Sequence, residues 1–392
     1  MTLLSGIRVL DLSLQLPGPF CTMMMADYGA DVVKIDEPSP RVRNPFSASV
    51  PGTGSVDRYL NRGKRSFTVN LKAGEGKEIF RKLAAGADVV LEGFRPGVVS
   101  RLGVDYETLS AENARLVYCS ISGYGQTGPM RDTAGHDINY VSYAGVLGAC
   151  GRKGSPPTLP PVQIGDLYGG AMMALSGILM ALLEREKTGK GRRIDVSMTD
   201  GSLAMLALVA PPVLAGEMVA ERGNMILTGM FPCYEAYRCS DGEYVSVGPL
   251  EGWFWKELVD AVGRPDLAGG QYALGEEGER VKAELSKVFA TRTRDEWVRA
   301  FEGKDVCLSP VLSVPEALSH ANTIARKMVL AVESPLGGTE PQLGMPIKID
   351  GVPENPRRAP HLGEHDDEIL AGLGYTEARI ADLRAKGVVR KR

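Results

Sequence analysis

The sequence GIRVLDLS at residues 6–13 decides the fold of the first half of the chain. It is a short, mostly apolar run of the kind that forms a buried strand of a parallel sheet. The Pro-Gly-Pro at 17–19 then starts a helix that continues to about residue 25, because proline is favoured in the first helical turn. The sequence ADVVKID at 30–36 follows as a second strand, rich in valine and isoleucine. This order predicts the beginning of a parallel α/β sheet.

The same alternation continues along the chain. Residues 74–85 form a helix with its apolar side chains on one face, and further strands are predicted at 66–71, 88–91, 116–121 and 193–198. Strands that alternate with helices over this length predict a Rossmann-like, doubly wound parallel sheet of the α/β class. Apolar helices are expected after residue 123, at 138–148, 168–186 and 204–214.

From residue 233 the pattern changes to α+β. Two strands at 233–238 and 243–247 predict a hairpin across Ser-Asp-Gly, and helices are expected at 253–262, 279–289, 294–301 and 366–386. Single cores stop growing near ~250–300 residues, so this chain needs more than one domain. We expect a large α/β domain at 1–224, a smaller α+β domain at 225–330, and a C-terminal segment at 331–392 that returns to the large domain.

The composition excludes several classes of protein. The chain has 392 residues, with 45 basic and 48 acidic side chains, and this balance argues against a nucleic-acid-binding protein. Its six cysteines form no CxxC pair and its N-terminus has no basic, cleavable leader, so we expect reduced thiols in a cytoplasmic protein. The longest largely apolar stretch, 171–183, is shorter than the about 20 residues that span a bilayer, so no membrane partner is expected.

Several well-known catalytic motifs do not occur. The first strand is not followed by GxGxxG, and the chain has neither a P-loop nor GxSxG. His361-Leu-Gly-Glu364-His365 fits the HxxEH pattern of inverted zinc peptidases, but Pro360 and Gly363 oppose the single helix that such a site needs. The acidic residues at 364–368 indicate the first turn of a helix instead. No metal site is therefore expected.

One candidate for acid/base chemistry is His136, in GHDINY at 135–140, where a glycine-rich loop meets a predicted helix. The positive end of a helix disfavours a protonated imidazole, which suits a histidine that accepts a proton. The simpler interpretation is that His136 or Asp137 only caps the helix.

Two carboxylates are further candidates. Asp166 lies in IGDLYGG at 164–170, before the longest apolar helix. Aspartate is a favoured N-cap, which is the simpler interpretation, but the flanking glycines give a ligand room and a dry core beside the carboxyl raises its pKa. Glu251 follows the predicted strand at 243–247, and by spacing alone it is a surface glutamate before a helix.

A series of motifs runs through the chain in order: GIRVLDLS, PGPF, GADVVKIDEP, EGFRPGVVSRLG, YGQTGP, AGHDINY, GDLYGG, EREKTGKG and IDVSMTDG. In this order, over nearly the whole chain, the sequence resembles the family III CoA-transferase superfamily. Within it, the chain is most similar to the alpha-methylacyl-CoA racemases. Glu251 is followed here by Gly-Trp-Phe-Trp, and the formyl-CoA type of transferase usually carries a glycine run in this region.

The resemblance implies a role for each candidate. His136 and Asp166 are the acid/base pair that moves the C2 proton of a 2-methylacyl-CoA thioester, and Glu251 supports His136. CoA is part of the substrate, no metal or redox cofactor is implied, and the family forms an intertwined homodimer. In the transferases the equivalent of Asp166 is instead a nucleophile that forms an acyl anhydride, and this activity stays the alternative. The acyl group is left open.

The resemblance also implies segments that bind CoA: Val69, Asn70, Leu71, Lys72, Gly93, Phe94, Arg95, Arg101, Gly135, Asp137, Ile138, Asn139 and Tyr140. The racemases commonly have an arginine after the second strand, where this chain has Glu37. Arg41 or Arg43 is expected to make that phosphate contact instead. Backbone N–H groups near Asp166, or at the start of its helix, are expected to bind the enolate oxygen.

Overall fold

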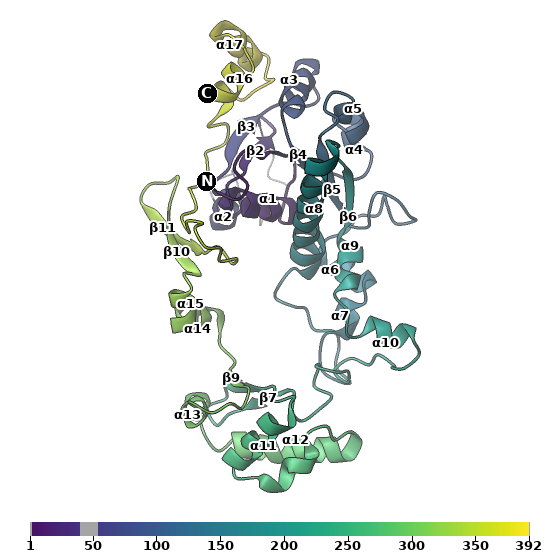
Figure 1. The fold of residues 1–392 in the computed structure, drawn as a ribbon, viewed down its shortest axis with the longest axis vertical. Helices are drawn as coiled ribbons and strands as arrows, with labels where there is room; N and C mark the ends of the chain where they lie inside the picture. The colour runs from purple at the N-terminus through teal and green to yellow at the C-terminus, as the bar shows by residue number, and fades with distance from the viewer. Residues whose placement is uncertain (1, 40–53, 392) are drawn as a thin grey trace. The chain divides into compact units, whose positions relative to one another are not determined.

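The computed structural model describes residues 2–39 and 54–391. A six-stranded sheet organises the first half of the chain (Figure 1), with strands β1 (Arg8–Asp11), β2 (Asp31–Asp36), β3 (Arg65–Thr68), β4 (Val89–Glu92), β5 (Val117–Ser122) and β6 (Arg193–Ser197). The order is β3-β2-β1-β4-β5-β6, and each neighbouring pair is parallel. The predicted Rossmann-like α/β sheet is therefore confirmed.

Helices cover both faces of this sheet. α1 (Pro17–Asp27) and α8 (Met173–Thr188) pack on the face that contains Val9. α3 (Gly74–Ala85), α4 (Val98–Leu102) and α5 (Tyr106–Ser110) contribute to the core on the face that contains Leu10. Successive side chains of a strand point to opposite faces, so a strand covered on both sides is apolar throughout. This explains the continuous apolar run that starts the chain.

The longest helical segment begins as a π-helix, η1 (Ile164–Met172), and continues as α8. Its glycines permit a close crossing with α9 (Met198–Ala204), because a Cβ atom on Gly169 would lie 2.4 Å from the carbonyl oxygen of Met198. By length and composition, Ile164–Thr188 is apolar enough to cross a membrane. Ala174 and Ile178, however, are fully buried in the core of the sheet, as expected for the core helix of a globular unit.

Two of the predicted helices after residue 123 are wrong in their extent. The helix expected at 138–148 is divided into α6 (Asp137–Tyr143) and α7 (Val146–Ala149), because Gly145 adopts a left-handed φ of +79°. The helix expected at 204–214 is only α10 (Ala210–Leu214), preceded by the end of α9. Pro211 and Pro212 lie in the first turn of α10, where proline can start a helix but not continue one.

The chain separates into two compact units. Unit 1 comprises the described parts of Met1–Ala144 together with Pro161–Met205 and Ala321–Arg392, and unit 2 comprises Gly145–Pro160 and Leu206–His320. Residues 145–160 and 206–224, which the sequence analysis placed in the large domain, therefore belong to unit 2. The C-terminal segment belongs to unit 1.

Unit 2 is built on an antiparallel sheet of β7 (Glu235–Arg238), β8 (Tyr244–Val247) and β9 (Leu308–Pro310), of which β7 and β8 form the expected hairpin. Its helices are α11 (Gly252–Ala261), α12 (Gly275–Phe289), α13 (Arg294–Ala300), α14 (Val314–Ser319) and the 3-10 helix η2 (Pro265–Gly270). Trp255, Phe289 and Trp297 are buried in its core. The short β9 has too few residues for a strand pattern in the sequence.

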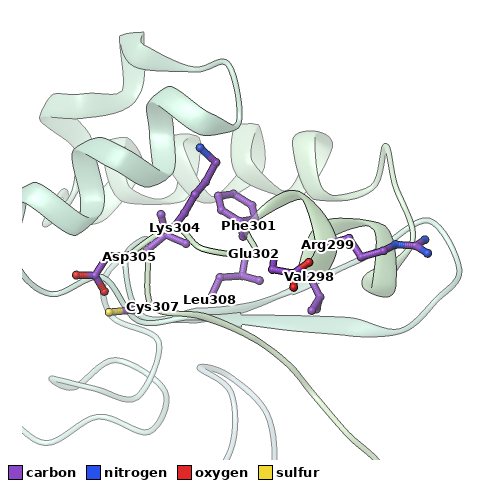
Figure 2. A pocket seen from close by; sticks show the side chains of 9 residues that line it. Val298, Arg299, Phe301, Glu302, Lys304, Asp305, Cys307 and Leu308 are labelled. Atoms are coloured by element: carbon purple, nitrogen blue, oxygen red, sulfur yellow. The ribbon is translucent and has the colours of Figure 1, made fainter.

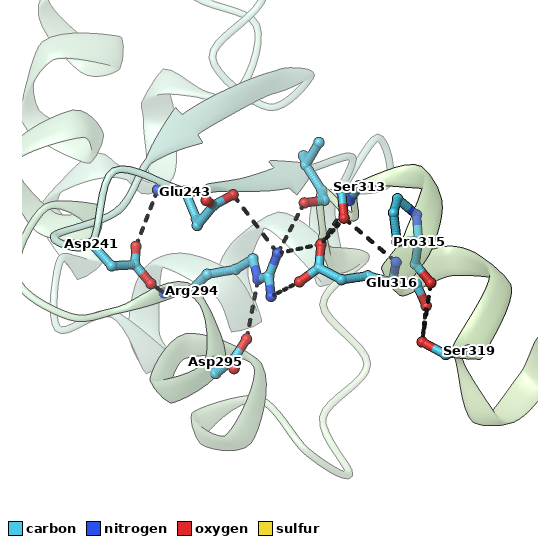
Figure 3. A network of polar contacts seen from close by, with 9 residues as sticks. Asp241, Glu243, Arg294, Asp295, Ser313, Pro315, Glu316 and Ser319 are labelled. Carbon is cyan, nitrogen blue, oxygen red and sulfur yellow. Dashed lines mark hydrogen bonds and ion pairs between the residues drawn. The ribbon is translucent and has the colours of Figure 1, made fainter.

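Arg294 connects the start of α14 to the rest of unit 2. Its Nη2 donates to Glu316 Oε1 at 2.7 Å, and its backbone N–H donates to Asp241 Oδ2 at 3.1 Å (Figure 3). Hydrogen bonds from Arg294 and Ser313 lower the pKa of Glu316 to about 2. Glu316 thus stays ionised at neutral pH and attaches the start of α14 to the rest of unit 2.

The C-terminal part of unit 1 contains α15 (Ala321–Ala325), a hairpin of β10 (Val329–Glu333) and β11 (Thr339–Leu343), α16 (Asp366–Gly372) and α17 (Glu377–Ala385). The sequence predicted one helix at 366–386, but Gly374, with a φ of +84°, separates two. The buried Asp366 accepts hydrogen bonds from the backbone N–H and the hydroxyl of Thr68, at 2.7 and 2.6 Å. These bonds attach α16 to the edge strand β3. The remaining helix of unit 1 is α2 (Ser55–Asn61).

Candidate active site

His136 is the N-cap residue of α6, at the end of the loop that follows β5. Its backbone N–H donates to Asn139 Oδ1 at 3.0 Å, and its side chain is exposed to solvent. Tyr140 fixes this turn, because its hydroxyl donates to the carbonyl oxygen of Gly135 at 2.5 Å. A Cβ atom on Gly123 would lie 2.4 Å from the Tyr140 ring, so glycine is required at that position. The loop thus holds His136 at a defined place with its imidazole in solvent.

Asp166 lies in the first turn of η1 and is half-buried. Its backbone N–H donates to Asp137 Oδ1 at 3.0 Å, and α6 packs against η1. Because Asp137 follows His136 directly, this bond brings the turn of His136 and the turn of Asp166 together. Two of the three predicted catalytic residues therefore lie on neighbouring turns of unit 1.

The surroundings of the Asp166 carboxyl raise its pKa. Burial raises its pKa to about 7, with a smaller contribution from the negative charge of Asp137. A group with such a pKa is present in both protonation states at pH 7, as an acid/base catalyst requires. This raised pKa agrees with the expectation from the apolar helix that follows Asp166.

Two backbone N–H groups of this turn hold the turn itself. The N–H of Asp166 donates to Asp137, and the N–H of Leu167 donates to the carbonyl oxygen of Gln163 at 2.9 Å. The expected binding of the enolate oxygen by N–H groups near Asp166 or at the start of its helix stays a prediction.

Glu251 is the N-cap residue of α11 in unit 2 and is exposed. The loop that carries it is anchored by the Gly248 N–H, which donates to the carbonyl oxygen of Cys307 at 2.9 Å. The predicted support of His136 by Glu251 stays a prediction.

The segment after β3, predicted to bind CoA, forms a tight turn. Asn70 Oδ1 accepts from the backbone N–H of Lys72 at 3.0 Å, and the Asn70 N–H donates to Val388. Val69 is buried and Leu71 half-buried, whereas Lys72 is exposed and forms an ion pair with Glu37 at 3.5 Å. Arg41 and Arg43 lie outside the described residues. Of the side chains in this turn, that of Lys72 is the cation best placed for a phosphate.

The loop after β4 places a second group of cations. Arg95 is exposed, and its charge opposes the rise in the pKa of Tyr140, so this side chain lies near the GHDINY segment. The guanidinium groups of Arg101 and Arg131 both lie beside Gly97, at 3.6 and 3.7 Å from the position of a Cβ atom there. Arg131 was not predicted. It stands in a polar loop without a motif, and only the fold brings it to Arg101.

Glu92 is a second residue that the sequence analysis missed. It ends β4 inside the core, 1% exposed, and its Oε2 accepts from the backbone N–H of Phe94 at 2.8 Å. Burial raises the pKa of Glu92 to about 7. This bond shapes the turn at Gly93 and Phe94 that leads to Arg95. A carboxylate at the end of an apolar strand was the available signal.

The HxxEH segment is a helix start, as expected. Glu364 accepts from the backbone N–H of His361 at 2.7 Å and pairs with Arg358, while His365 is the N-cap residue of α16. No group of three or more potential metal ligands occurs within residues 2–39 and 54–391.

The two cavities described within these residues are lined by other side chains. One, of about 640 Å³, lies in unit 1 between the Gly63–Arg65 turn, the β10–β11 hairpin and residues 355–368. The other, of about 500 Å³, lies in unit 2 (Figure 2) and is lined by Val298, Arg299, Phe301, Glu302, Lys304, Asp305, Val306, Cys307 and Leu308.

A doubly wound sheet with paired titratable residues near its carboxyl edge is typical of an α/β enzyme. The model of CoA-transferase family III matches residues 4–366. The alpha-methylacyl-CoA racemase of Homo sapiens is 36% identical over 387 residues, which cover 98% of this chain and 97% of that protein. The formyl-CoA:oxalate CoA-transferase of Streptomyces avermitilis is 33% identical over 414 residues, covering 98% and 99%.

The solved structures agree. The crystal structure of a CAIB/BAIF family protein from Brucella suis has a TM-score of 0.80 and 30% identity, and the match covers 95% of this chain and 99% of that chain. The chain belongs to CoA-transferase family III. Its relatives include a racemase and transferases, so the family indicates an enzyme and leaves its activity to be argued from the site.

Proposed function

We propose that this protein is a racemase that interconverts the (2R) and (2S) forms of a 2-methylacyl-CoA thioester. The observation that carries the proposal is the hydrogen bond from the Asp166 N–H to Asp137, the residue that follows His136, beside an Asp166 carboxyl whose pKa of about 7 allows it to act as acid or base. Racemisation needs two such groups on one carbon, in opposite protonation states. The similarity to alpha-methylacyl-CoA racemase supports the same activity.

In the proposed reaction, C2 of the substrate loses one proton to the enzyme and receives another from it. Neutral His136 removes the C2 proton, and the electron pair of the broken C–H bond moves through C2 to the thioester oxygen, forming an enolate. Protonated Asp166 then delivers its proton to the opposite face of C2. The enzyme is left with imidazolium at His136 and carboxylate at Asp166, and these groups carry the reverse direction. Glu251 would stabilise the imidazolium, as the acid of a catalytic triad does.

CoA enters this proposal as part of the substrate, and the reaction needs no further cofactor. Arg95, Arg101 and Lys72 carry exposed cations that suit its phosphates. We further propose that the protein is cytoplasmic, as its cysteines suggest, and that it acts as an intertwined homodimer, as the family resemblance implies.

Isotope exchange tests the proposal directly. A 2-methylacyl-CoA incubated with the enzyme in deuterated water should gain deuterium at C2 and racemise, with no acceptor acid present. His136→Gln should reduce proton removal from one enantiomer far more than from the other, because each base serves one face. Equal residual exchange from both enantiomers would contradict the two-base assignment.

A CoA-transferase is the second candidate, favoured by similarity to formyl-CoA and succinyl-CoA transferases at 31–33% identity. In that reaction the Asp166 carboxylate attacks the thioester carbonyl, the C–S bond breaks, and CoA thiolate leaves behind an acyl anhydride on the enzyme. Hydroxylamine would trap that acyl group, and turnover would require a free acid as acceptor. Both results together would replace the racemase proposal.

A further inference from the structure

Asp137 forms a hydrogen bond that joins α6 to the turn of Asp166. Its Oδ1 accepts from the Asp166 N–H at 3.0 Å, across 29 residues of sequence. A Cβ atom on Gly165 would lie 3.0 Å from the same Oδ1 and 3.3 Å from Tyr140 Cβ. The absence of a side chain at 165 therefore lets the Asp137 carboxylate reach the backbone of η1.

The same carboxylate places a negative charge beside Asp166. Of the groups on elements packed against η1, Asp137 of α6 raises the pKa of Asp166 through its charge, and Asp166 in turn raises that of Tyr140. Asp200 of α9 and Arg193 and Asp195 of β6 are exposed to solvent. Burial raises the pKa of Tyr140 to about 12, with a contribution from Asp166, so its phenol stays neutral at pH 7. Tyr168, on η1 itself, is exposed. The charge that acts on Asp166 in the described chain is thus a like charge.

We infer that Asp137 is a positioning residue for Asp166: its carboxylate holds the first turn of η1 through the Asp166 N–H and sets a fixed negative charge beside the Asp166 carboxyl. This inference rests on the proposed acid/base role of Asp166 and adds a reason for that role. The hydrogen bond orients the Asp166 carboxyl. The like charge favours the protonated form of Asp166, which delivers a proton to C2. The assignment goes beyond contact with CoA, which is what the family resemblance implies for Asp137.

Two substitutions separate the two effects. Asp137→Asn keeps an acceptor oxygen and removes the charge, whereas Asp137→Ala removes both. Aspartate carboxyl carbons labelled with 13C report the titration of Asp166, which Asp166→Asn identifies by the loss of its signal. The midpoint should move to lower pH in Asp137→Asn. The matched control Asp132→Asn removes an exposed carboxylate from the preceding loop and should leave the midpoint unchanged.

Amide hydrogen exchange reports the other effect. The Asp166 N–H should stay protected in Asp137→Asn and lose protection in Asp137→Ala. Deuterium incorporation at C2 should follow: Asp137→Asn moves the alkaline limb of the direction that needs protonated Asp166 to lower pH. Asp137→Ala also lowers the rate about 10²-fold at every pH, because the acid is displaced.

The inference is overturned if Asp137→Asn titrates like the wild type, or if Asp137→Ala keeps the Asp166 amide protected. Circular dichroism and the melting temperature show whether Asp137→Ala is folded, and Asp137→Asn provides the titration test if it is not. The titration and amide exchange need no turnover. If both behave as expected while no 2-methylacyl-CoA exchanges, the proposed function fails and the positioning by Asp137 stands.

Discussion

Two carboxylates of unit 1, Asp11 and Asp166, are both removed from water but have opposite surroundings. Asp11 ends β1, fully buried, and accepts from Ser13, from Thr22 Oγ1 at 2.6 Å and from Lys64 Nζ at 3.1 Å. Burial alone would raise its pKa, but Lys64 and Lys34 hold the pKa well below its usual value. Asp166 has Asp137 as its charged neighbour, and its pKa rises to about 7.

The comparison shows that one fold can contain both a structural carboxylate, Asp11, and a candidate acid/base carboxylate, Asp166. A buried carboxylate paired with ammonium groups cannot take up a proton at neutral pH, and it ties elements together. Lys64 bridges Asp11 to the carbonyl oxygen of Pro19 at 3.0 Å, at the start of α1. A half-buried carboxylate without a neighbouring cation can exchange protons near neutral pH, the range in which an enzyme works. Substitutions at each site test this contrast.

Asp166→Asn should give the largest effect on activity. Loss of one acid/base group should slow racemisation by about 10²–10⁴-fold, because the amide cannot exchange a proton. Chiral chromatography of the acyl-CoA after timed incubation measures the rate. The Asp132→Asn control should keep the wild-type rate, and racemisation by Asp166→Asn at that rate would exclude Asp166 from the chemistry.

Lys64→Met should give the largest effect on stability. It leaves the Asp11 carboxylate buried without its nearest cation, which costs about 3–5 kcal/mol. Urea unfolding followed by circular dichroism measures the loss. Lys187→Met, at an exposed position, serves as the control. The double variant Asp11→Asn with Lys64→Met should recover part of the loss, and no recovery would show that the pair is not the cause.

The two carboxylates should give opposite pH dependences of stability. The raised pKa of Asp166 means that the folded state binds a proton more tightly, so this stabilisation is complete below about pH 3.8 and is lost as pH rises through about 7. The lowered pKa of Asp11 gives stabilisation that is present above its ordinary pKa and is lost on acidification. Unfolding free energies from pH 4 to 8 should therefore decline less steeply in Asp166→Asn, by a few kcal/mol at most. An identical slope would contradict the raised pKa.

Lys72→Met should give the smallest effect on stability. Its ion pair with Glu37 is exposed, and such pairs contribute about 0–1 kcal/mol. The same variant should raise the KM for acyl-CoA with little change in kcat, because the cation is proposed to bind phosphate. Loss of stability comparable to that of Lys64→Met would show that pairing, and not burial, governs both sites.

The strands were predictable because the pattern of the sheet is local. β1, β2, β4 and β5 contain short apolar runs between turn residues, whereas β3 and β6 are mixed, and each predicted strand overlaps an observed one. The ends of the helices were harder to predict from the sequence. Gly145 and Gly374 end helices through left-handed backbone, but a glycine in the sequence does not show which φ it adopts. The β10–β11 hairpin was missed because β11 contains Glu340, Pro341 and Gln342 and lacks an apolar pattern, although β10 is mostly apolar.

The main residues of the candidate site could be predicted from the sequence, but the contacts around them could not. His136 and Asp166 were found from the residues around them and from the family resemblance. Arg131 and Glu92 were missed, because an arginine in a polar loop and a glutamate at a strand end carry no chemistry until the fold gives them neighbours.

The sequence by itself determined the parallel sheet, the apolar helix beside Asp166 and the motifs that place the chain in its family, because these depend on residues close together along the chain. The pairing of Lys64 with Asp11 and the hydrogen bond between Asp137 and Asp166 depend on the folded chain. Burial and charge act over a few ångströms of space, and the residues that supply them lie 53 and 29 positions apart in the sequence.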